Sequence, residues 1–320
     1  MKYIVTTSIH SPSEATLKYL EICQNVDHDQ PLAENWHMVL VGDKKTPHQE
    51  YTDLEKQYPN FHYMTPTEQE KNYKELSDII GWNKVARRTL GFCYAYMQGA
   101  EIVATVDDDN IPYDNWGKEI LIGKEIECDC WDSQTLNVID PLQVTNHQDI
   151  WHRGYPLELI KHKSSIEYVG KRTMTPLIQA NLWDGDPDID AICRLTKKPT
   201  VMFDPNIKPY CFNKISPFNS QNTMIARIAL PYYFLPPYLG RMDDIWGGYL
   251  LQDRFKDSLV YAKATVYQKR NDHDVVKDLE DEIIGYRNTK KFIDDGLTMD
   301  QPFIDERNRI FCETYMNFFK

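Results

Sequence analysis

Ile102-Val103-Ala104-Thr105-Val106 runs directly into Asp107-Asp108-Asp109-Asn110, and this stretch decides the fold. An apolar, β-rich run without polar alternation is typical of a strand that is buried on both faces. Such strands belong to parallel sheets that are covered by helices. The three acids follow the strand at its carboxyl end, which is where ligands bind in open α/β sheets.

The residues before this strand alternate between strand and helix patterns. Short apolar or β-branched runs predict strands at 3–6, 37–41 and 61–64, and apolar spacing predicts a helix over 83–97 that Gly99 ends. A first helix is expected at Ser11-Pro12-Ser13-Glu14, with Ser11 as its cap and Glu14 completing a capping box. Strands that alternate with helices predict an α/β fold with a doubly wound, mostly parallel sheet flanked by helices.

The second half of the chain has weaker patterns. Residues 125–210 are rich in Pro, Asp and aromatic residues and contain few long periodic segments. Short helices are expected at 222–229 and 246–255. The charged tail from residue 275 onward predicts a helix that packs through Val275, Val276, Leu279 and Ile283.

Composition narrows the class of protein. The 320 residues are 42% hydrophobic and 26% charged, as in ordinary globular proteins. A net charge of −12 disfavours binding to nucleic acid, because an acidic surface repels phosphate backbones. The seven irregularly spaced cysteines predict reduced thiols, and the longest apolar stretch, 228–239, contains three prolines and is too short to span a bilayer. A cytoplasmic protein without a transmembrane segment is therefore expected.

Three consecutive carboxylates after a buried strand repel one another, and a divalent cation would relieve that repulsion. Carboxylate oxygens suit Mn²⁺ or Mg²⁺, which then bridges diphosphate oxygens. Asp107 and Asp109 are the candidate metal ligands, and Asp107 and Asp108 the candidates for the ribose side. The alternative is a solvated acidic turn, since Asp is common in turns.

Other polar segments supply candidate contacts to a nucleotide. Asp43 follows the second predicted strand and can accept hydrogen bonds from a base or ribose, while Lys44 can meet phosphate. Arg87 and Arg88 precede the acidic strand on a helix, and one of them can reach phosphate at the sheet edge. The alternatives are a polar turn before Pro47 and a basic pair that faces solvent.

Two later segments carry candidates for the reaction itself. Asp243 and Asp244 can serve as general base or orient a sugar, with the Trp246 ring stacked on a sugar face; the alternative is acids favoured at a helix N-terminus. Lys269 and Arg270 can hold a leaving diphosphate, and His273 can complete a metal shell. The alternative for that segment is a capped helix start at Asn271 or Asp272.

Taken together, these segments resemble the STELLO-type glycosyltransferases, in the same order and over most of the chain to about residue 285. Fewer of them are similar to the reversibly glycosylated polypeptides, which are UDP-arabinopyranose mutases. The matching segments are Val5-Thr6-Thr7, Val41-Gly42-Asp43-Lys44-Lys45-Thr46-Pro47, Ala86-Arg87-Arg88, Asp107-Asp108-Asp109-Asn110, Trp151-His152-Arg153-Gly154-Tyr155-Pro156-Leu157, Gly185-Asp186-Pro187-Asp188-Ile189-Asp190-Ala191, Arg194-Leu195-Thr196, Gln268-Lys269-Arg270-Asn271 and His273-Asp274.

The resemblance implies a GT-A-like nucleotide-sugar fold, with residues 1–275 as the catalytic domain and 276–320 as a helical extension. It implies a metal-dependent transferase that uses a nucleotide-sugar. A UDP-sugar is the expected donor, and the acceptor stays open between a glycan, a lipid-linked molecule and a protein. Thr6 and Asp190 join the nucleotide-sugar contacts on this basis. Two alternatives stay open: a sugar-ring mutase that forms a reversible glycosyl-arginine at Arg153, and a scaffold without activity.

Overall fold

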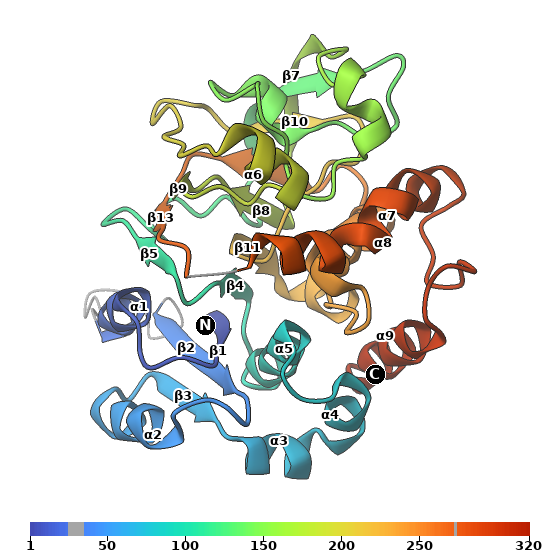
Figure 1. Ribbon diagram of the computed structural model, residues 1–320. Coiled ribbons are helices and arrows are strands. Elements are labelled where there is room, and N and C mark those ends of the chain that lie inside the picture. The colour runs from blue at the N-terminus through green and yellow to red at the C-terminus, as the bar shows by residue number, and fades with distance from the viewer. Residues whose placement is uncertain (25–34, 272–273) are drawn as a thin grey trace.

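The computed structural model describes residues 1–24, 35–271 and 274–320. Its main sheet has the strand order β3-β2-β1-β4-β11-β8-β12-β10-β6-β7 (Figure 1). In chain order these strands are β1 (Lys2–Ser8), β2 (Trp36–Gly42), β3 (Phe61–Met64), β4 (Ile102–Val106), β6 (Ile126–Asp132), β7 (Glu167–Met174), β8 (Ile178–Asn181), β10 (Tyr210–Phe212), β11 (Asn222–Ala226) and β12 (Leu259–Ala262).

The predicted α/β sheet with flanking helices is confirmed, and its parallel part is the N-terminal half. Strands β3, β2, β1 and β4 are all parallel neighbours. Beyond β4 the sheet is mixed: β11 runs antiparallel to both β4 and β8, whereas β8 and β12 are parallel. The carboxyl ends of β1, β2 and β4 therefore meet the amino end of β11 at one edge.

The N-terminal strands are connected by helices, as the alternating sequence pattern predicts. Helix α5 lies so close to β1 that a Cβ at Gly91 would stand 2.5 Å from Val5 Cγ1, so only glycine fits there. The helices of this half are α1 (Glu14–Gln24), α2 (His48–Gln57), α3 (Pro66–Asn72), α4 (Lys74–Ile80), the 3₁₀ turn η2 (Val85–Arg87) and α5 (Arg88–Met97).

Two local predictions need correction. The hydroxyl oxygen of Ser13, not of Ser11, accepts the backbone N–H of Thr16 at the start of α1. The helix expected at 222–229 is strand β11 followed by the 3₁₀ helix η5 (Arg227–Tyr232). All five residues of β11 are buried between β4 and β8, and pairing on both sides overrides the local pattern.

A second, small sheet extends the edge beside the three acids. It consists of β5 (Asn110–Pro112), β13 (Val266–Gln268) and β9 (Asp184–Gly185), with β13 in the middle. The backbone N–H of Lys269 donates to the carbonyl of Asp109 at 3.0 Å, just beyond this pairing. The sheet thus brings residues 268–271 against the end of β4.

The C-terminal helices pack on both halves of the molecule. They are α7 (Asp243–Arg254), α8 (Val275–Asp294) and α9 (Glu306–Phe318); the middle region adds α6 (Ala191–Lys197) and the 3₁₀ helices η3 (Pro141–Val144), η4 (Leu157–His162) and η6 (Gly240–Met242). Helix α8 lies against η6 and α6, whereas α9 lies mainly against α4 of the N-terminal half (Figure 1). The helical tail is confirmed. Among the described residues, no helix is long and apolar enough to cross a membrane.

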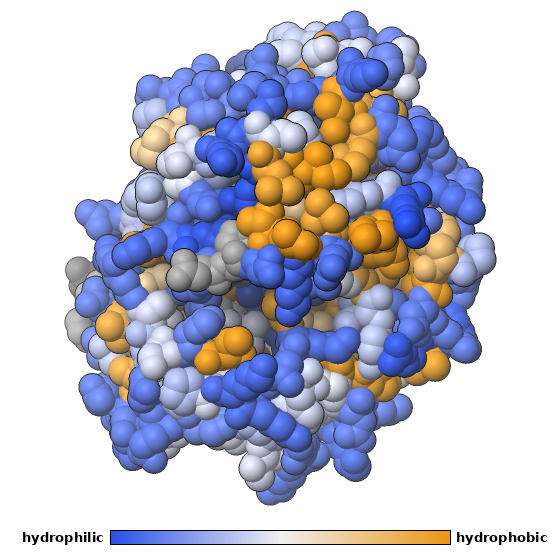
Figure 2. All heavy atoms as spheres, in the orientation of Figure 1, coloured by the Kyte–Doolittle hydropathy of each residue, from blue (hydrophilic) through white to orange (hydrophobic). Residues whose placement is uncertain are grey.

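Helix α8 packs through a different face from the one predicted. Glu282, Gly285, Thr289 and Phe292 are buried, whereas Val276 is 64% exposed. Figure 2 shows apolar surface over this part of the molecule. The sequence pattern misled because the buried face holds a carboxylate and two small residues, which a hydrophobic periodicity does not detect.

Candidate active site

A cavity of about 520 Å³ lies at the carboxyl edge of β1, β2 and β4. Its charged lining comes from segments far apart in the sequence: the acids Asp43, Asp107, Asp108, Asp109, Asp188, Asp243 and Asp244, and the bases Lys45, Lys84, Arg88, Arg153, Arg241, Arg270 and Lys277. Seven acids against seven bases make this region formally neutral in a chain of net charge −12. An anionic ligand therefore meets less repulsion here than over the rest of the surface.

The three acids after β4 are held in different ways. Asp107 Oδ1 lies 2.5 Å from Arg88 Nη2, and the carboxylate of Asp108 accepts a hydrogen bond from the Ser8 hydroxyl. Asp109 Oδ2 accepts the backbone N–H of Asn271 at 3.2 Å, while its Oδ1 is buried without a hydrogen-bond partner among the described residues. A buried carboxylate oxygen without a donor is costly unless a cation reaches it.

The pKa shifts of these acids also indicate that a cation would stabilise the site. Burial, together with the charges of Asp107 and Asp108, raises the pKa of Asp109 to about 7. Burial also raises the pKa of Asp108. The ionised forms of these carboxylates are thus disfavoured by their own surroundings, and a divalent cation at this position would favour them.

The donor set fits one kind of metal site. The described residues contain no group of three or more His, Cys, Asp or Glu side chains placed to hold a metal ion. Mg²⁺, however, is usually bound through one or two carboxylates, with substrate phosphates and water completing its shell. Asp107 and Asp109 match that mode with hard oxygen donors. His273, the other predicted ligand, lies outside the described residues.

The two arginines predicted to contact phosphate, Arg88 and Arg87, lie in different environments. Arg88 lines the cavity, where its Nη1 also donates to the hydroxyl and carbonyl of Ser220 at 2.8 and 3.0 Å. It therefore holds Asp107 against the start of β11. Arg87 is fully buried, and its guanidinium donates to Gln69, Ser77 and Gly81. Its predicted contact with phosphate is wrong, because these partners hold it inside the protein.

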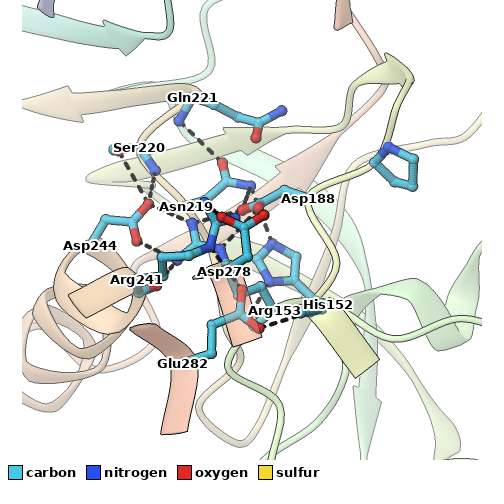
Figure 3. Close-up of polar contacts among 12 residues, drawn as sticks. His152, Arg153, Asp188, Asn219, Ser220, Gln221, Arg241, Asp244, Asp278 and Glu282 are labelled. Atoms are coloured by element: carbon cyan, nitrogen blue, oxygen red, sulfur yellow. Dashed lines mark hydrogen bonds and ion pairs between the residues drawn. The ribbon is translucent and has the colours of Figure 1, made fainter. Parts of the chain in front are cut away.

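Arg153 is the centre of a buried ion network (Figure 3). Its Nε and Nη2 donate to both oxygens of Asp188 at 2.9 Å, and its Nη1 and Nη2 donate to Asp244 at 3.0 and 3.2 Å. The remaining N–H of Nη1 donates to the carbonyl of Arg241. All five guanidinium N–H groups are used. Although burial opposes it, the charges of Asp188 and Asp244 raise the pKa of Arg153 well above its usual value.

This network argues against Arg153 as a nucleophile. A glycosyl-arginine requires a nitrogen lone pair, and therefore loss of a proton from the guanidinium. The two carboxylates favour the charged form, and the attacking nitrogen would have to abandon its bonds to Asp188, Asp244 or the Arg241 carbonyl. Arg153 instead connects the loop that carries Asp188 to the N-terminus of α7 through its hydrogen bonds to Asp188 and Asp244.

The two acids at the start of α7 differ in how many hydrogen bonds their carboxylates accept. Asp244 accepts from Arg153 and from the amide and hydroxyl of Ser220, at 2.9 and 3.1 Å, so both of its oxygens are bound. Asp243 also lines the cavity, and its Oδ1 accepts the backbone N–H of Asp244 at 2.9 Å. Burial and repulsion from Asp244 raise the pKa of Asp243 to about 7. Of the pair, Asp243 is the better candidate for proton transfer.

Arg270 reaches the cavity and Lys269 does not. The guanidinium of Arg270 is bonded to Asp186 at 3.2 Å through Nε and to the carbonyl of Pro187 through Nη2, which leaves Nη1 without a partner among the described residues. Its charge also acts on Asp109. Lys269 is exposed and does not line the cavity, so only its backbone contributes there.

The remaining predicted contacts are structural. Asp43 lines the cavity, but its oxygens accept the backbone N–H groups of Lys44 and Asn83 at 2.6 and 2.7 Å. The ammonium of Lys44 lies over the Trp82 ring, 4.6 Å from its centroid and outside the cavity lining. It is the neighbouring Lys45 that lines the cavity.

Trp246, Asp190 and Thr6 lie away from the cavity lining. Trp246 is completely buried, with its ring stacked on Phe292 at 4.4 Å, so the predicted stacking on a sugar is wrong. Asp190 caps α6 by accepting the Cys193 N–H, and it also accepts the indole N–H of Trp151. Thr6 is buried inside β1.

Several lining residues escaped the sequence analysis, among them Ser220, Arg241 and Lys277. Ser220 was missed because the segment after it was taken for a helix, which does not place its start at the sheet edge. Arg241 stands just before the predicted acids at 243 and 244, and the basic residue beside them was the available signal. Lys277 carried no signal, since charged residues are common along an exposed helix.

No protein-family model and no curated protein matches this chain. Solved structures that it resembles include glucosyl-3-phosphoglycerate synthase from Mycobacterium tuberculosis in complex with Mn²⁺, UDP and phosphoglyceric acid, with 11% identity, a TM-score of 0.47, and coverage of 90% of this chain and 78% of that one. TarS of S. aureus in complex with UDP-GlcNAc has 12% identity, a TM-score of 0.44, and coverage of 99% and 72%. A mannosyltransferase from Pyrobaculum calidifontis with GDP-Man and Mn²⁺ has 11% identity, a TM-score of 0.44, and coverage of 98% and 69%.

Proposed function

We propose that this chain is a metal-dependent glycosyltransferase of GT-A-like fold whose donor is a nucleoside-diphosphate sugar, foremost a UDP-sugar. The observation that carries the proposal is the buried Oδ1 of Asp109, which has no hydrogen-bond partner among the described residues and feels the charge of Arg270, in a cavity at the carboxyl ends of the parallel strands. A carboxylate that needs a cation, and an arginine whose Nη1 donates to no described residue, are complementary to a metal-bound diphosphate.

Each residue then has a defined task. Asp107 and Asp109 hold Mn²⁺ or Mg²⁺, which supplies Lewis-acid stabilisation of the departing diphosphate. Arg88 keeps Asp107 in place, and Arg270 donates to a phosphate oxygen. A hydroxyl oxygen of the acceptor bonds to the sugar's anomeric carbon, the bond to the diphosphate breaks, and the hydroxyl proton passes to Asp243. A carboxyl group with a pKa near 7 is suited to that transfer at neutral pH.

The test is calorimetric titration of UDP into the protein with Mn²⁺ and with EDTA. We expect binding that needs the metal, because the acids repel a bare diphosphate. Asp109→Asn should weaken the metal-dependent binding by about tenfold or more, since it removes a charged ligand. Asp243→Asn should leave UDP affinity unchanged and abolish sugar transfer. Equal UDP affinity in Mn²⁺ and EDTA contradicts the metal role, and absence of any UDP binding favours the scaffold alternative.

A further inference from the structure

A second group of cations lines the same cavity where η6 meets α8. Arg241 belongs to η6, and Lys277 lies in the first turn of α8. The two elements pack closely: a Cβ added at Gly240 would stand only 2.1 Å from the carbonyl oxygen of Asp281. Neither cation was needed for the metal and diphosphate, so they call for another ligand.

Arg241 is anchored at one side and open at the other. Its Nε donates to Glu282 at 2.8 Å, and its Nη1 pairs with Asp278 at 3.3 Å. No described residue accepts a hydrogen bond from its Nη2. Glu282 is completely buried and also accepts the N–H of Ala191 at 2.7 Å, so the anchor is rigid. The guanidinium is thereby preorganised, with donors left for an anion.

Lys277 adds a second positive charge on the adjacent helix. It is exposed, lines the cavity, and has no ion pair or hydrogen bond of its side chain among the described residues. Its neighbour Asp278 is the residue that pairs with Arg241. Arg241 and Lys277 lie on packed elements and both line one cavity, so they form a binding site for an oxyanion, which we call the seat.

The seat adjoins the proposed base. Asp243 follows Arg241 by two residues, and Lys84 lines the same cavity. Burial lowers the pKa of Lys84, and the nearby charge of Asp243 offsets part of that effect. The ammonium of Lys84 is fixed by the carbonyl of Pro237 at 2.6 Å and by the Tyr238 ring at 3.8 Å. An anion held here brings the rest of its molecule next to Asp243.

We infer that the acceptor is itself anionic, with a phosphate monoester group seated on Arg241 and Lys277 and a hydroxyl directed at Asp243. The inference rests on the proposed function for the hydroxyl, while the seat stands on its own contacts. A phosphate group bound at Arg241 and Lys277 could belong either to the acceptor or to the donor diphosphate, because the two share the same chemistry. The donor diphosphate is assigned to the Asp109 and Arg270 side of the cavity, so the two sources can be separated by experiment.

The experiment adds glycerol 2-phosphate to the protein saturated with UDP and Mg²⁺ and measures binding by calorimetry. We expect the wild-type complex to bind it. Lys277→Gln and Arg241→Lys should each weaken that binding by about tenfold, as expected for losing a hydrogen bond to a charged group. Both variants should keep their UDP affinity within about twofold. Arg287→Gln is the matched control, since it removes one charge from the exposed face of α8 outside the cavity lining.

Three outcomes overturn the inference. The first is no binding of glycerol 2-phosphate to the wild-type complex. The second is competition with UDP together with lower UDP affinity in Lys277→Gln, which gives the seat to the donor. The third is equal binding by Lys277→Gln and wild type. If UDP and Mg²⁺ do not bind at all, the proposed function fails, and glycerol 2-phosphate titrated into the free wild type and Lys277→Gln still decides the seat.

Discussion

Arg153→Ala should destabilise the protein strongly and should do so without removing a reactive group. The substitution leaves Asp188 and Asp244 buried, at 3% and 4% exposure, without the guanidinium that donates four hydrogen bonds to them. Removing one partner of a buried ion pair costs about 3–5 kcal/mol. For a protein of this size each kcal/mol lowers the melting temperature by about 2–4 °C, so a loss of roughly 10 °C is expected.

The assay is thermal and urea denaturation of wild type, Arg153→Ala and Arg153→Lys. Lysine restores the charge and not the five-donor fork, so its melting temperature should fall between the other two. Arg172→Ala is the control, because Arg172 pairs with the exposed Asp257 and surface pairs contribute about 0–1 kcal/mol.

Two results would refute this reasoning. One is a melting temperature of Arg153→Ala equal to that of wild type, which would mean that the network does not hold the site together. The other is a sugar adduct on Arg153, seen by mass spectrometry after incubation with UDP-sugars and no acceptor. That adduct would restore the mutase alternative in spite of the saturated guanidinium.

Two further predictions concern residues away from the cavity. Trp246→Ala should cost about 3–5 kcal/mol of stability by opening a void against Phe292, while UDP affinity of the folded protein stays unchanged; weaker UDP binding at full folding would return Trp246 to the site. Burial raises the pKa of Asp140 to about 6, above its unfolded value, so the folded state binds more protons between pH 4 and pH 6, and stability from this group rises as pH falls. Asp140→Asn, which keeps the acceptor for Leu142 and His152, should remove about 2 kcal/mol of that pH dependence between pH 4 and pH 7 in denaturant titrations; an unchanged slope would contradict the shift.

Much of the N-terminal half could be predicted from the sequence, because local pattern and tertiary environment agree there. The run 102–106 is a strand, and the acids after it line the cavity. The spacing of 83–97 also predicts a helix, although its first turn is the 3₁₀ helix η2. Such strands read clearly because burial on both faces requires continuous apolar residues.

The second half of the chain could not be predicted in the same way, because contacts with residues distant in the sequence determine its secondary structure and side-chain directions. Strand β11 has no alternation that distinguishes it from a short helix, and only its pairing with β4 and β8 defines it. Arg87 and Arg88 are adjacent and chemically identical, yet one is enclosed by Gln69 and Ser77 and the other faces Asp107. Arg87 ends the 3₁₀ turn η2 and Arg88 begins α5, so the change of helix type that directs the two side chains differently falls between them, and a helical pattern does not reveal it.

The insertion of β11 has a consequence for synthesis of the chain. Strand β4 completes the parallel set early, but its outer side is covered only by β11, which emerges from the ribosome more than a hundred residues later. Until then the nascent chain carries an open strand edge, and such edges pair with other chains. The same late segment brings Ser220 to Arg88 and Asp244. Closure of this exposed strand edge therefore also places polar contacts of the candidate active site, and the later segments with Asp243 and Arg270 complete it.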